Sequence, residues 1–308
     1  MDVDTIQTDA HSYTLDAAFA YCAAITLAHY ENYPVASIFL PQEKRPYIQA
    51  IYAFSRVADD FADEENRSPE ERIGKLNDWE EKLVQCYGGH ADHPVFIALG
   101  ETVRRNNIPI EPLKDLLTAF KRDVTQKRYR TFDDLLSYCR CSANPVGRLV
   151  LMIFGHRDEA LFKLSDNICT ALQLTNFWQD VAVDRQKDRL YLPVEDLQRF
   201  GWSIESWSDG VMEESFRQLM KFEAERTRTL FYEGAELPSL VEKELRIELK
   251  LVWFGGMSIL KRLEKIRYDV FHRRPALSSL NKFMILVRGL FIHDLTHYQR
   301  KKKPWDLT

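Results

Sequence analysis

The stretch Gln173-Leu-Thr-Asn176-Phe-Trp-Gln-Asp180-Val-Ala-Val-Asp184 sets polar side chains four residues apart in an otherwise largely apolar sequence. Side chains at this spacing lie on one face of an α-helix, so Asn176, Asp180 and Asp184 are predicted to share a face. Carboxylates one turn apart repel each other, and near a helix C-terminus they also oppose the helix dipole. A helix that carries them there is expected to need a cationic partner.

A second acidic cluster, Asp59-Asp-Phe-Ala-Asp63-Glu-Glu65, follows the apolar stretch 48–58. Asp59 and Asp63 are again four residues apart and are predicted to share a helix face. With 46 acidic residues in the chain, one such pair is usually a solvated surface. Both clusters follow core-like helices, however, and acids in such surroundings need partners. Mg²⁺ prefers oxygen ligands and shares them with substrate phosphates, so two such faces are suited to a magnesium diphosphate.

Basic residues accompany both clusters: Arg56 precedes the first, and Arg185 and Arg189 follow the second. Guanidinium groups bind diphosphate oxygens and pair equally well with neighbouring carboxylates, so both roles stay open at this point. The chain also contains 18 Phe, 13 Tyr and 6 Trp. Aromatic rings suit a pocket that stabilises a carbocation, although a single ring such as Phe54 or Trp178 is more often a core residue.

Outside these clusters the sequence predicts one all-α domain. Apolar residues recur at helical spacing with almost no alternation, and no linker or repeat interrupts them. We expect a tail at 1–13, a helical domain at 14–298 and a basic tail at 299–308. The predicted helices are Asp16–Tyr30, Pro41–Glu65, helices beginning at Ser68, His93, Pro112, Asp133, Asn144 and Asp158 (the last ending near Asp184), then Glu213–Glu233, Pro238–Phe271 and Ser278–His297.

The bulk composition excludes some classes of function. The 308 residues carry a formal net charge of −4, which gives no reason to expect a nucleic acid partner. The five cysteines are odd in number and form no CxxC pair, which favours reduced thiols in a cytoplasmic protein. No signal peptide is expected from residues 1–12, and no apolar run approaches the length of a membrane span.

The C-terminal region has two interpretations. The apolar stretch Asn281–Ile292 is followed by Arg300-Lys-Lys-Lys303. A packed terminal helix with a solvated tail is the more common arrangement in soluble proteins. A peripheral contact with the inner face of the cytoplasmic membrane is the alternative.

Several of these stretches resemble known motifs. Asp59-Asp-Phe-Ala-Asp63 resembles the first aspartate-rich motif of the trans-isoprenyl diphosphate synthases. The stretch 173–184 and its continuation Asp188-Arg-Leu-Tyr-Leu-Pro193 resemble the second motif of the squalene/phytoene synthases. Tyr138-Cys139, followed by Val146-Gly147, resembles the Tyr-Cys segment of that family. The matches keep the family order from about residue 30 to 275.

The resemblance implies an isoprenoid synthase helical bundle with a central cavity and an isoprenoid diphosphate substrate, with enzymes of the same pathway as further partners. It implies that Arg56, Gln173, Arg189 and Tyr191 line the diphosphate region and that Tyr138 lies near the reacting carbons. The implied Mg²⁺ ligands are Asp59, Asp63, Asn176, Asp180 and Asp184.

Some positions depart from members that couple two prenyl diphosphates. Residues 31–37 lack the Ser-Phe/Tyr-Ser element, Asn144 and Cys141 replace common residues, and Gly255-Gly256 stands where many members have a tyrosine. These features resemble the bacterial hydroxysqualene synthases of hopanoid biosynthesis, which ionise presqualene diphosphate and let water capture the cation without NADPH. The alternatives are a squalene, presqualene diphosphate or phytoene synthase, a class I terpene cyclase, and a non-catalytic assembly factor of the same fold.

Overall fold

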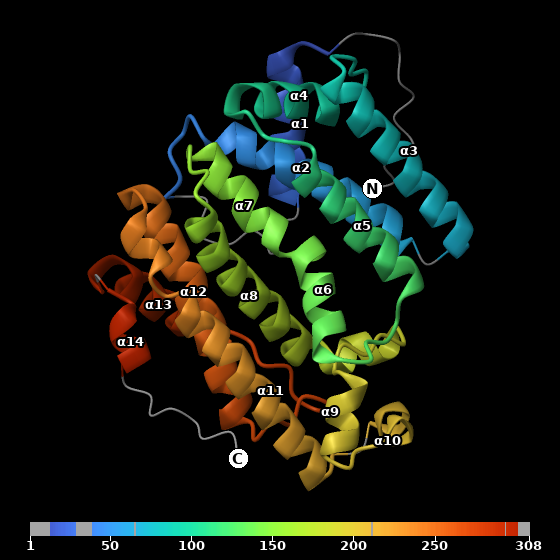
Figure 1. The fold of residues 1–308 in the computed structure, drawn as a ribbon, viewed down its shortest axis with the longest axis vertical. Coiled ribbons are helices and arrows are strands. Elements are labelled where there is room, and N and C mark those ends of the chain that lie inside the picture. The colour runs from blue at the N-terminus through green and yellow to red at the C-terminus, as the bar shows by residue number, and fades with distance from the viewer. Residues whose placement is uncertain (1–12, 29–38, 65, 211, 293, 301–308) are drawn as a thin grey trace.

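The computed structural model describes residues 13–300 apart from 29–38, 65, 211 and 293, and it is an all-α structure (Figure 1). The described residues contain helices and one isolated bridge between Arg128 and Leu190, but no strand, which confirms the all-α prediction. The helices are α1 (Leu15–Ala28), α2 (Arg45–Asp63), α3 (Pro69–Tyr87), α4 (Pro94–Asn106), α5 (Glu111–Thr125), α6 (Phe132–Ser142), α7 (Asn144–Ile153), α8 (Glu159–Gln186), α9 (Val194–Arg199), α10 (Ile204–Asp209), α11 (Glu214–Glu233), the 3₁₀-helix η3 (Leu237–Leu240), α12 (Lys243–Lys265), α13 (Ser279–Phe291) and α14 (Thr296–Arg300).

Several predicted helix boundaries were wrong. Helix α2 begins at Arg45 rather than Pro41, because residues 42–44 form a turn. The predicted helix Pro238–Phe271 is divided: Val241 is extended, and the helix stops before Arg267 and Tyr268, which adopt positive φ. The predicted C-terminal helix is likewise divided into α13 and α14, and the short helices α9 and α10 were not predicted. The segment 31–37 and nearly all of the two predicted tails lie outside the described residues.

Other helix starts agree with the local sequence. Ser68 accepts a hydrogen bond from the Glu71 backbone N–H, and the Glu71 carboxylate accepts one from Ser68, with Pro69 in the first turn. Thr131 and Asp134 form the same reciprocal cap at the start of α6. Each cap satisfies backbone donors that the helix leaves without partners, which fixes where the helix begins.

The long helix α8 lies inside the bundle, in contact with α6, α7, α11 and α12 (Figure 1). Two glycines permit the close packing around it. A Cβ atom at Gly147 of α7 would lie 2.3 Å from Ser165 Oγ of α8, and one at Gly256 of α12 would lie 2.2 Å from Phe231 Cζ of α11. The Trp178 indole of α8 donates to Thr227 Oγ1 of α11 at 2.8 Å. These contacts hold the helix that carries the second acidic cluster.

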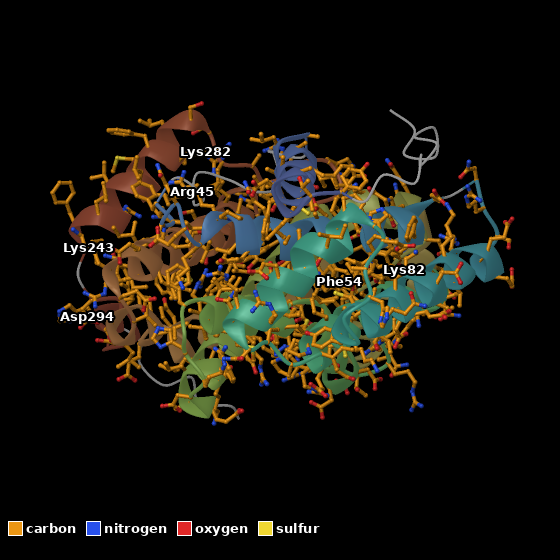
Figure 2. All side chains as sticks on the ribbon, turned by 90° about the horizontal axis from the view of Figure 1, so that it is seen from above. Arg45, Phe54, Lys82, Lys243, Lys282 and Asp294 are labelled. Carbon is orange, nitrogen blue, oxygen red and sulfur yellow. The ribbon has the colours of Figure 1, made fainter. Side chains whose placement is uncertain are left out.

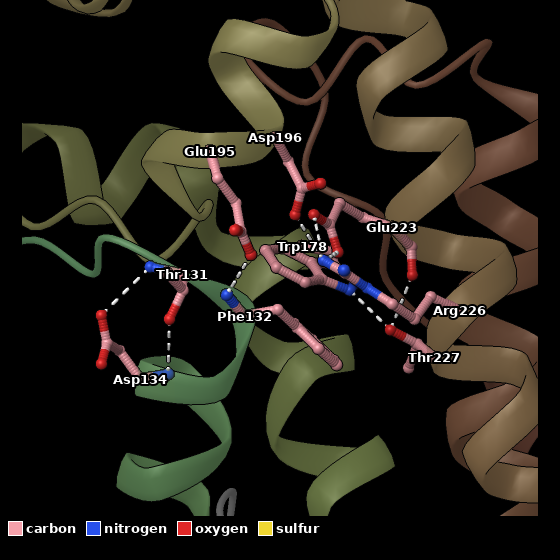
Figure 3. A network of polar contacts seen from close by, with 9 residues as sticks. All are labelled: Thr131, Phe132, Asp134, Trp178, Glu195, Asp196, Glu223, Arg226 and Thr227. Atoms are coloured by element: carbon pink, nitrogen blue, oxygen red, sulfur yellow. Dashed lines mark hydrogen bonds and ion pairs between the residues drawn. The ribbon is translucent and has the colours of Figure 1, made fainter.

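The segment after α8 is held in place by α5–α6 loop residues and by α11. Leu190 N donates to Lys127 O, and Val194 N donates to Tyr129 O, each at 3.0 Å. Figure 3 shows the buried ion cluster that holds α9 on α11: the Arg226 guanidinium lies 2.8 Å from Asp196 Oδ2 and 2.7 Å from both Glu223 carboxylate oxygens. The same guanidinium lies 3.4 Å from the centre of the Phe132 ring. Residues 187–193 are therefore anchored at both ends.

Helix α12 contains an acid that reduces stability. Burial raises the pKa of Glu248 to about 8, and Glu248 Oε2 is buried without a hydrogen-bond partner. The folded state thus holds a proton that the unfolded state releases near pH 4.5, so stability falls as the pH rises from about 4.5 to about 8. We expect Glu248→Gln to raise the free energy of unfolding by roughly 1–3 kcal/mol at pH 9 and by much less at pH 5.

Urea denaturation at the two pH values measures this difference. Glu244→Gln is the matched control, because Glu244 lies on the same helix but is exposed. Equal effects of the Glu248 substitution at both pH values would contradict the assignment.

No helix among the described residues is both long enough and apolar enough to cross a membrane. The five cysteines are free thiols.

Candidate active site

The structure brings the two acidic clusters together. Asp63, at the end of α2, lies 3.1 Å from Lys187 Nζ and 2.9 Å from Arg189 Nη2. Lys187 and Arg189 directly follow α8, the helix that carries Asp180 and Asp184. The carboxyl-terminal ends of α2 and α8 therefore face the same site, although more than a hundred residues separate them.

Cations of the chain itself neutralise most of these carboxylates. Arg56 lies 3.3 Å from Asp59 and 2.5 Å from Asp60. Asp180 is paired with Arg274 at 2.5 Å. Two roles were left open for the arginines, and Arg56 and Arg189 both pair with acids in this structure. The guanidinium of Arg185 lies 5.7 Å from the centre of the Phe271 ring.

Burial and neighbouring acids raise the pKa values of two carboxylates in the site. Burial, followed by repulsion from Asp180, raises the pKa of Asp184 to about 7. Burial and the neighbouring Asp63 raise the pKa of Asp59. Burial would also raise the pKa of Asp63, but hydrogen bonds from Arg189 and Lys187 hold it below its ordinary value. The site thus stabilises protonated or cation-bound forms of Asp59 and Asp184.

We tested whether these residues suit a magnesium ion. Among the described residues no three His, Cys, Asp or Glu side chains already converge on one metal-sized point. Asn176 is exposed and Gln173 is half-buried on α8. The predicted ligands Asp59, Asp63, Asn176, Asp180 and Asp184 supply oxygen donors, and repulsion from Asp63 and Asp180 adds to burial in raising the pKa values of Asp59 and Asp184. This chemistry fits a hard divalent cation.

Aromatic residues surround the inner side of the site. The Tyr191 ring stacks on Phe177 with centroids 3.6 Å apart, and Tyr138 lies 6.1 Å from Tyr191. A small hollow of about 170 Å³, too narrow in this structure to admit a water molecule, is lined by Asp184, Arg189, Tyr191, Phe177, Val181 and Trp207 among others. The hollow therefore joins one acid of the second cluster, one guanidinium and an apolar wall.

The sequence analysis missed a buried acid, Asp123 of α5. The Tyr138 hydroxyl donates to Asp123 Oδ2 at 2.9 Å, and Asp123 Oδ1 is buried without a partner. Burial raises the pKa of Asp123 to about 7 despite this hydrogen bond. The signal in the sequence was its spacing: Asp123 follows the buried residues Leu116 and Ala119 at helical intervals, and it is itself half-buried. Lys187 and Arg274 were also missed, because no periodic pattern marks them.

We expect Tyr138→Phe to lower the free energy of unfolding by about 1–3 kcal/mol above pH 8, because it leaves ionised Asp123 with no donor. The loss should be smaller at pH 5, where the Asp123 carboxyl is protonated in the folded protein. Adding Asp123→Asn should restore most of the loss at the higher pH.

Chemical denaturation of the single and double variants checks this prediction. Tyr87→Phe is the control, because the Tyr87 hydroxyl donates to the neutral backbone carbonyls of Ile108 and Pro109. Its effect should not change across this pH range, and a Tyr138→Phe effect with the same lack of pH dependence would contradict the Asp123 contact.

Known proteins match this chain over most of its length. A family model described as squalene/phytoene synthase matches residues 26–281. A phytoene synthase from Arthrospira platensis is 29% identical over 286 residues, which cover 89% of this chain and 92% of that protein. A hydroxysqualene synthase from Sinorhizobium fredii is 34% identical over 262 residues, which cover 84% of this chain and 87% of that protein.

Among solved structures, the squalene synthase HpnC from Alicyclobacillus acidocaldarius has a TM-score of 0.79 at 40% identity, covering 82% of this chain and 95% of that one. The sequence match spans both acidic clusters, and the structural match extends to the helical bundle that brings them together. The chain belongs to the squalene/phytoene synthase family of isoprenoid synthases.

Proposed function

We propose that this chain is a hydroxysqualene synthase, which ionises presqualene diphosphate and lets water capture the rearranged cation. The observation that carries the proposal is the meeting of the two aspartate clusters, through Lys187, Arg189 and Asp63, beside an aromatic hollow. The 34% identity to a hydroxysqualene synthase supports this reaction. The acids of both clusters are intact, which argues against a non-catalytic assembly factor.

In the mechanism the acidic clusters bind the head group. Asp59, Asp63, Asn176, Asp180 and Asp184 would hold Mg²⁺, which when bound neutralises charge on the departing diphosphate. Arg56 and Arg189 now pair with acids and would exchange those contacts for diphosphate oxygens, with Gln173 and Tyr191 beside them. Stacked Tyr191 and Phe177 would exclude water from the diphosphate and stabilise positive charge through their ring faces.

The proposed reaction removes diphosphate and adds water. The C–O bond to diphosphate breaks, and the electron pair leaves with the diphosphate. The cyclopropylcarbinyl cation rearranges, and a water oxygen bonds to carbon and then loses a proton. Asp123 would accept that proton on Oδ1, which is buried and has no hydrogen-bond partner, while its Oδ2 accepts the hydrogen bond from Tyr138. Burial raises the pKa of Tyr138 well above its ordinary value, so its hydroxyl stays a neutral donor.

One observation favours a different step in the same family. The phytoene synthase from Arthrospira platensis aligns over 89% of this chain, and Tyr138 matches the tyrosine used by members that couple two prenyl diphosphates. Coupling two prenyl diphosphates is therefore the second candidate. The departure at Gly255 weighs against it. A Cβ atom there would meet nothing within 4 Å, so packing does not require a glycine at this position, where many members carry a tyrosine.

A product assay separates the candidates. Purified protein is incubated with Mg²⁺ or with EDTA, and is given either presqualene diphosphate or farnesyl diphosphate, each with and without NADPH. We expect Mg²⁺-dependent hydroxysqualene from presqualene diphosphate alone, with farnesyl diphosphate unconsumed. Consumption of farnesyl diphosphate would replace the proposed reaction by the coupling step. Turnover of neither substrate would contradict both candidate reactions and would favour a terpene cyclase or a non-catalytic assembly factor.

A further inference from the structure

Helix α13 turns an apolar face outward. Only Ile285 and Gly289 of this helix are buried, where it packs on α12. The α13 apolar face consists of Leu280, Phe283, Met284, Leu290 and Phe291, whose exposed fractions are 69%, 59%, 43%, 42% and 73%. Figure 1 places α13 at the outer edge of the molecule beside α12 and α14. Folding of the isolated chain therefore leaves much of the apolar surface of these side chains in contact with water.

This concentration is specific to α13. The other large hydrophobic residues that are exposed in the described part of the chain are spread singly over several elements, as Leu15, Leu27, Val84, Val146, Val183, Ile204 and Leu240. Scattered single residues of this kind are normal on a soluble surface, whereas a contiguous patch marks an interaction site. The two phenylalanines are the largest contributors and lie two helical turns apart.

The charged residues of α13 itself have one sign. The sequence Ser279–Phe291 contains no acid, and its charged residues, Lys282 and Arg288, are both exposed. The chain continues to Arg300-Lys-Lys-Lys303, although the formal net charge of the whole chain is −4. In the view of Figure 2, Lys282, Arg45 and Lys243 lie at the same end of the molecule, where the acid Asp294 also lies. A surface of this kind complements anionic head groups.

We propose that the α13 apolar face docks on the surface of a bilayer that contains anionic lipids, with the helix axis parallel to the membrane plane. Large apolar residues on one face, flanked by Lys and Arg, are typical of helices that lie in the interface. No described helix can span a bilayer, so the attachment is peripheral.

Vesicle sedimentation with the full chain tests the proposal. The probes are vesicles of phosphatidylcholine alone and vesicles with equal parts of phosphatidylglycerol. We expect the wild-type chain to sediment mainly with the anionic vesicles. Phe283→Ser combined with Phe291→Ser should weaken this binding at least tenfold, on the order expected from removing two large side chains from the interface. Lys282→Glu combined with Arg288→Glu should abolish the preference for phosphatidylglycerol.

Val84→Ser is the matched control, because Val84 is 48% exposed on α3, away from this face. It should sediment like the wild-type chain. All variants should keep wild-type product formation in the vesicle-free assay, so failure of docking and failure of the proposed function are read separately. Absence of wild-type sedimentation, or equal sedimentation of the Phe283→Ser, Phe291→Ser variant, would overturn the proposal. A wild-type dimer in lipid-free gel filtration that this variant dissociates would assign the face to a second copy of the chain instead.

Discussion

Asp180→Ala is expected to reduce product formation by at least roughly 10²–10³-fold, the range found when one preorganised group that stabilises transition-state charge is removed. Asp180 lies on the α8 face that the proposed function assigns to metal binding, one turn before Asp184. Its loss would leave Asp184 as the one carboxylate that α8 contributes to a bound cation.

The fold should survive this substitution. Arg274, the ion-pair partner of Asp180, is 59% exposed and returns to water when the carboxylate is removed. Loss of an exposed pair changes the free energy of unfolding by less than about 1 kcal/mol, and relief of repulsion with Asp184 offsets part of that. The measurement is the turnover rate with Mg²⁺, together with the urea midpoint. Asp92→Ala removes a carboxylate from the exposed pair with Lys82 and should leave turnover unchanged. Wild-type rates for Asp180→Ala would exclude the metal-site assignment.

Arg226→Met is expected to lower the free energy of unfolding by about 3–5 kcal/mol, because it leaves a buried charge without its partner. The side chain of Glu223 is 0% exposed and that of Asp196 is 5% exposed, and both pair with this guanidinium. Burial already raises the pKa of Glu223 to about 8 although Arg226 lowers it. The loss should therefore grow as the pH rises, because deprotonation of Glu223 becomes more costly without the arginine.

The position of this cluster also predicts a loss of activity. The cluster ties α9 to α11 (Figure 3). The segment that precedes α9 carries Arg189 and Tyr191. Urea denaturation at pH 6 and pH 9 gives the stability, and Glu223→Leu in the same chain should recover part of it. Arg104→Met is the control, since Arg104 is 70% exposed in its pair with Glu101 and should cost less than about 1 kcal/mol. A midpoint like that of the wild-type chain would contradict the role assigned to Arg226.

The parts of the structure that follow from local sequence were predicted. Helical spacing gave the all-α class, and proline with a capping residue gave the start of α3. The spacing of four residues put Asp180 and Asp184 on one face of α8, and Asp59 and Asp63 on one face of α2. These features depend on interactions within a few residues, which periodicity records directly.

The parts that depend on tertiary contacts could not be predicted in the same way. The pairing of Asp180 with Arg274 joins residues 94 apart, and nothing near either residue signals it. Helix α9 has six residues, too few for a periodic pattern, and it is held by a distant arginine on α11. Asp123 is half-buried on α5, and its stabilising partner Tyr138 comes from the next helix. The division of the predicted helix Pro238–Phe271 reflects backbone geometry at Val241 and Arg267 that the apolar pattern does not record.

The contacts of Asp63 with Lys187 and Arg189 join residues 124 and 126 positions apart, so the site forms only when both halves of the chain have met. Closing so long a loop has a high entropic cost, which places this step late in folding. A chain still being synthesised therefore has no partner for Asp63 until Lys187 and Arg189 have emerged, so the first cluster waits on the second half of the chain for its charge balance.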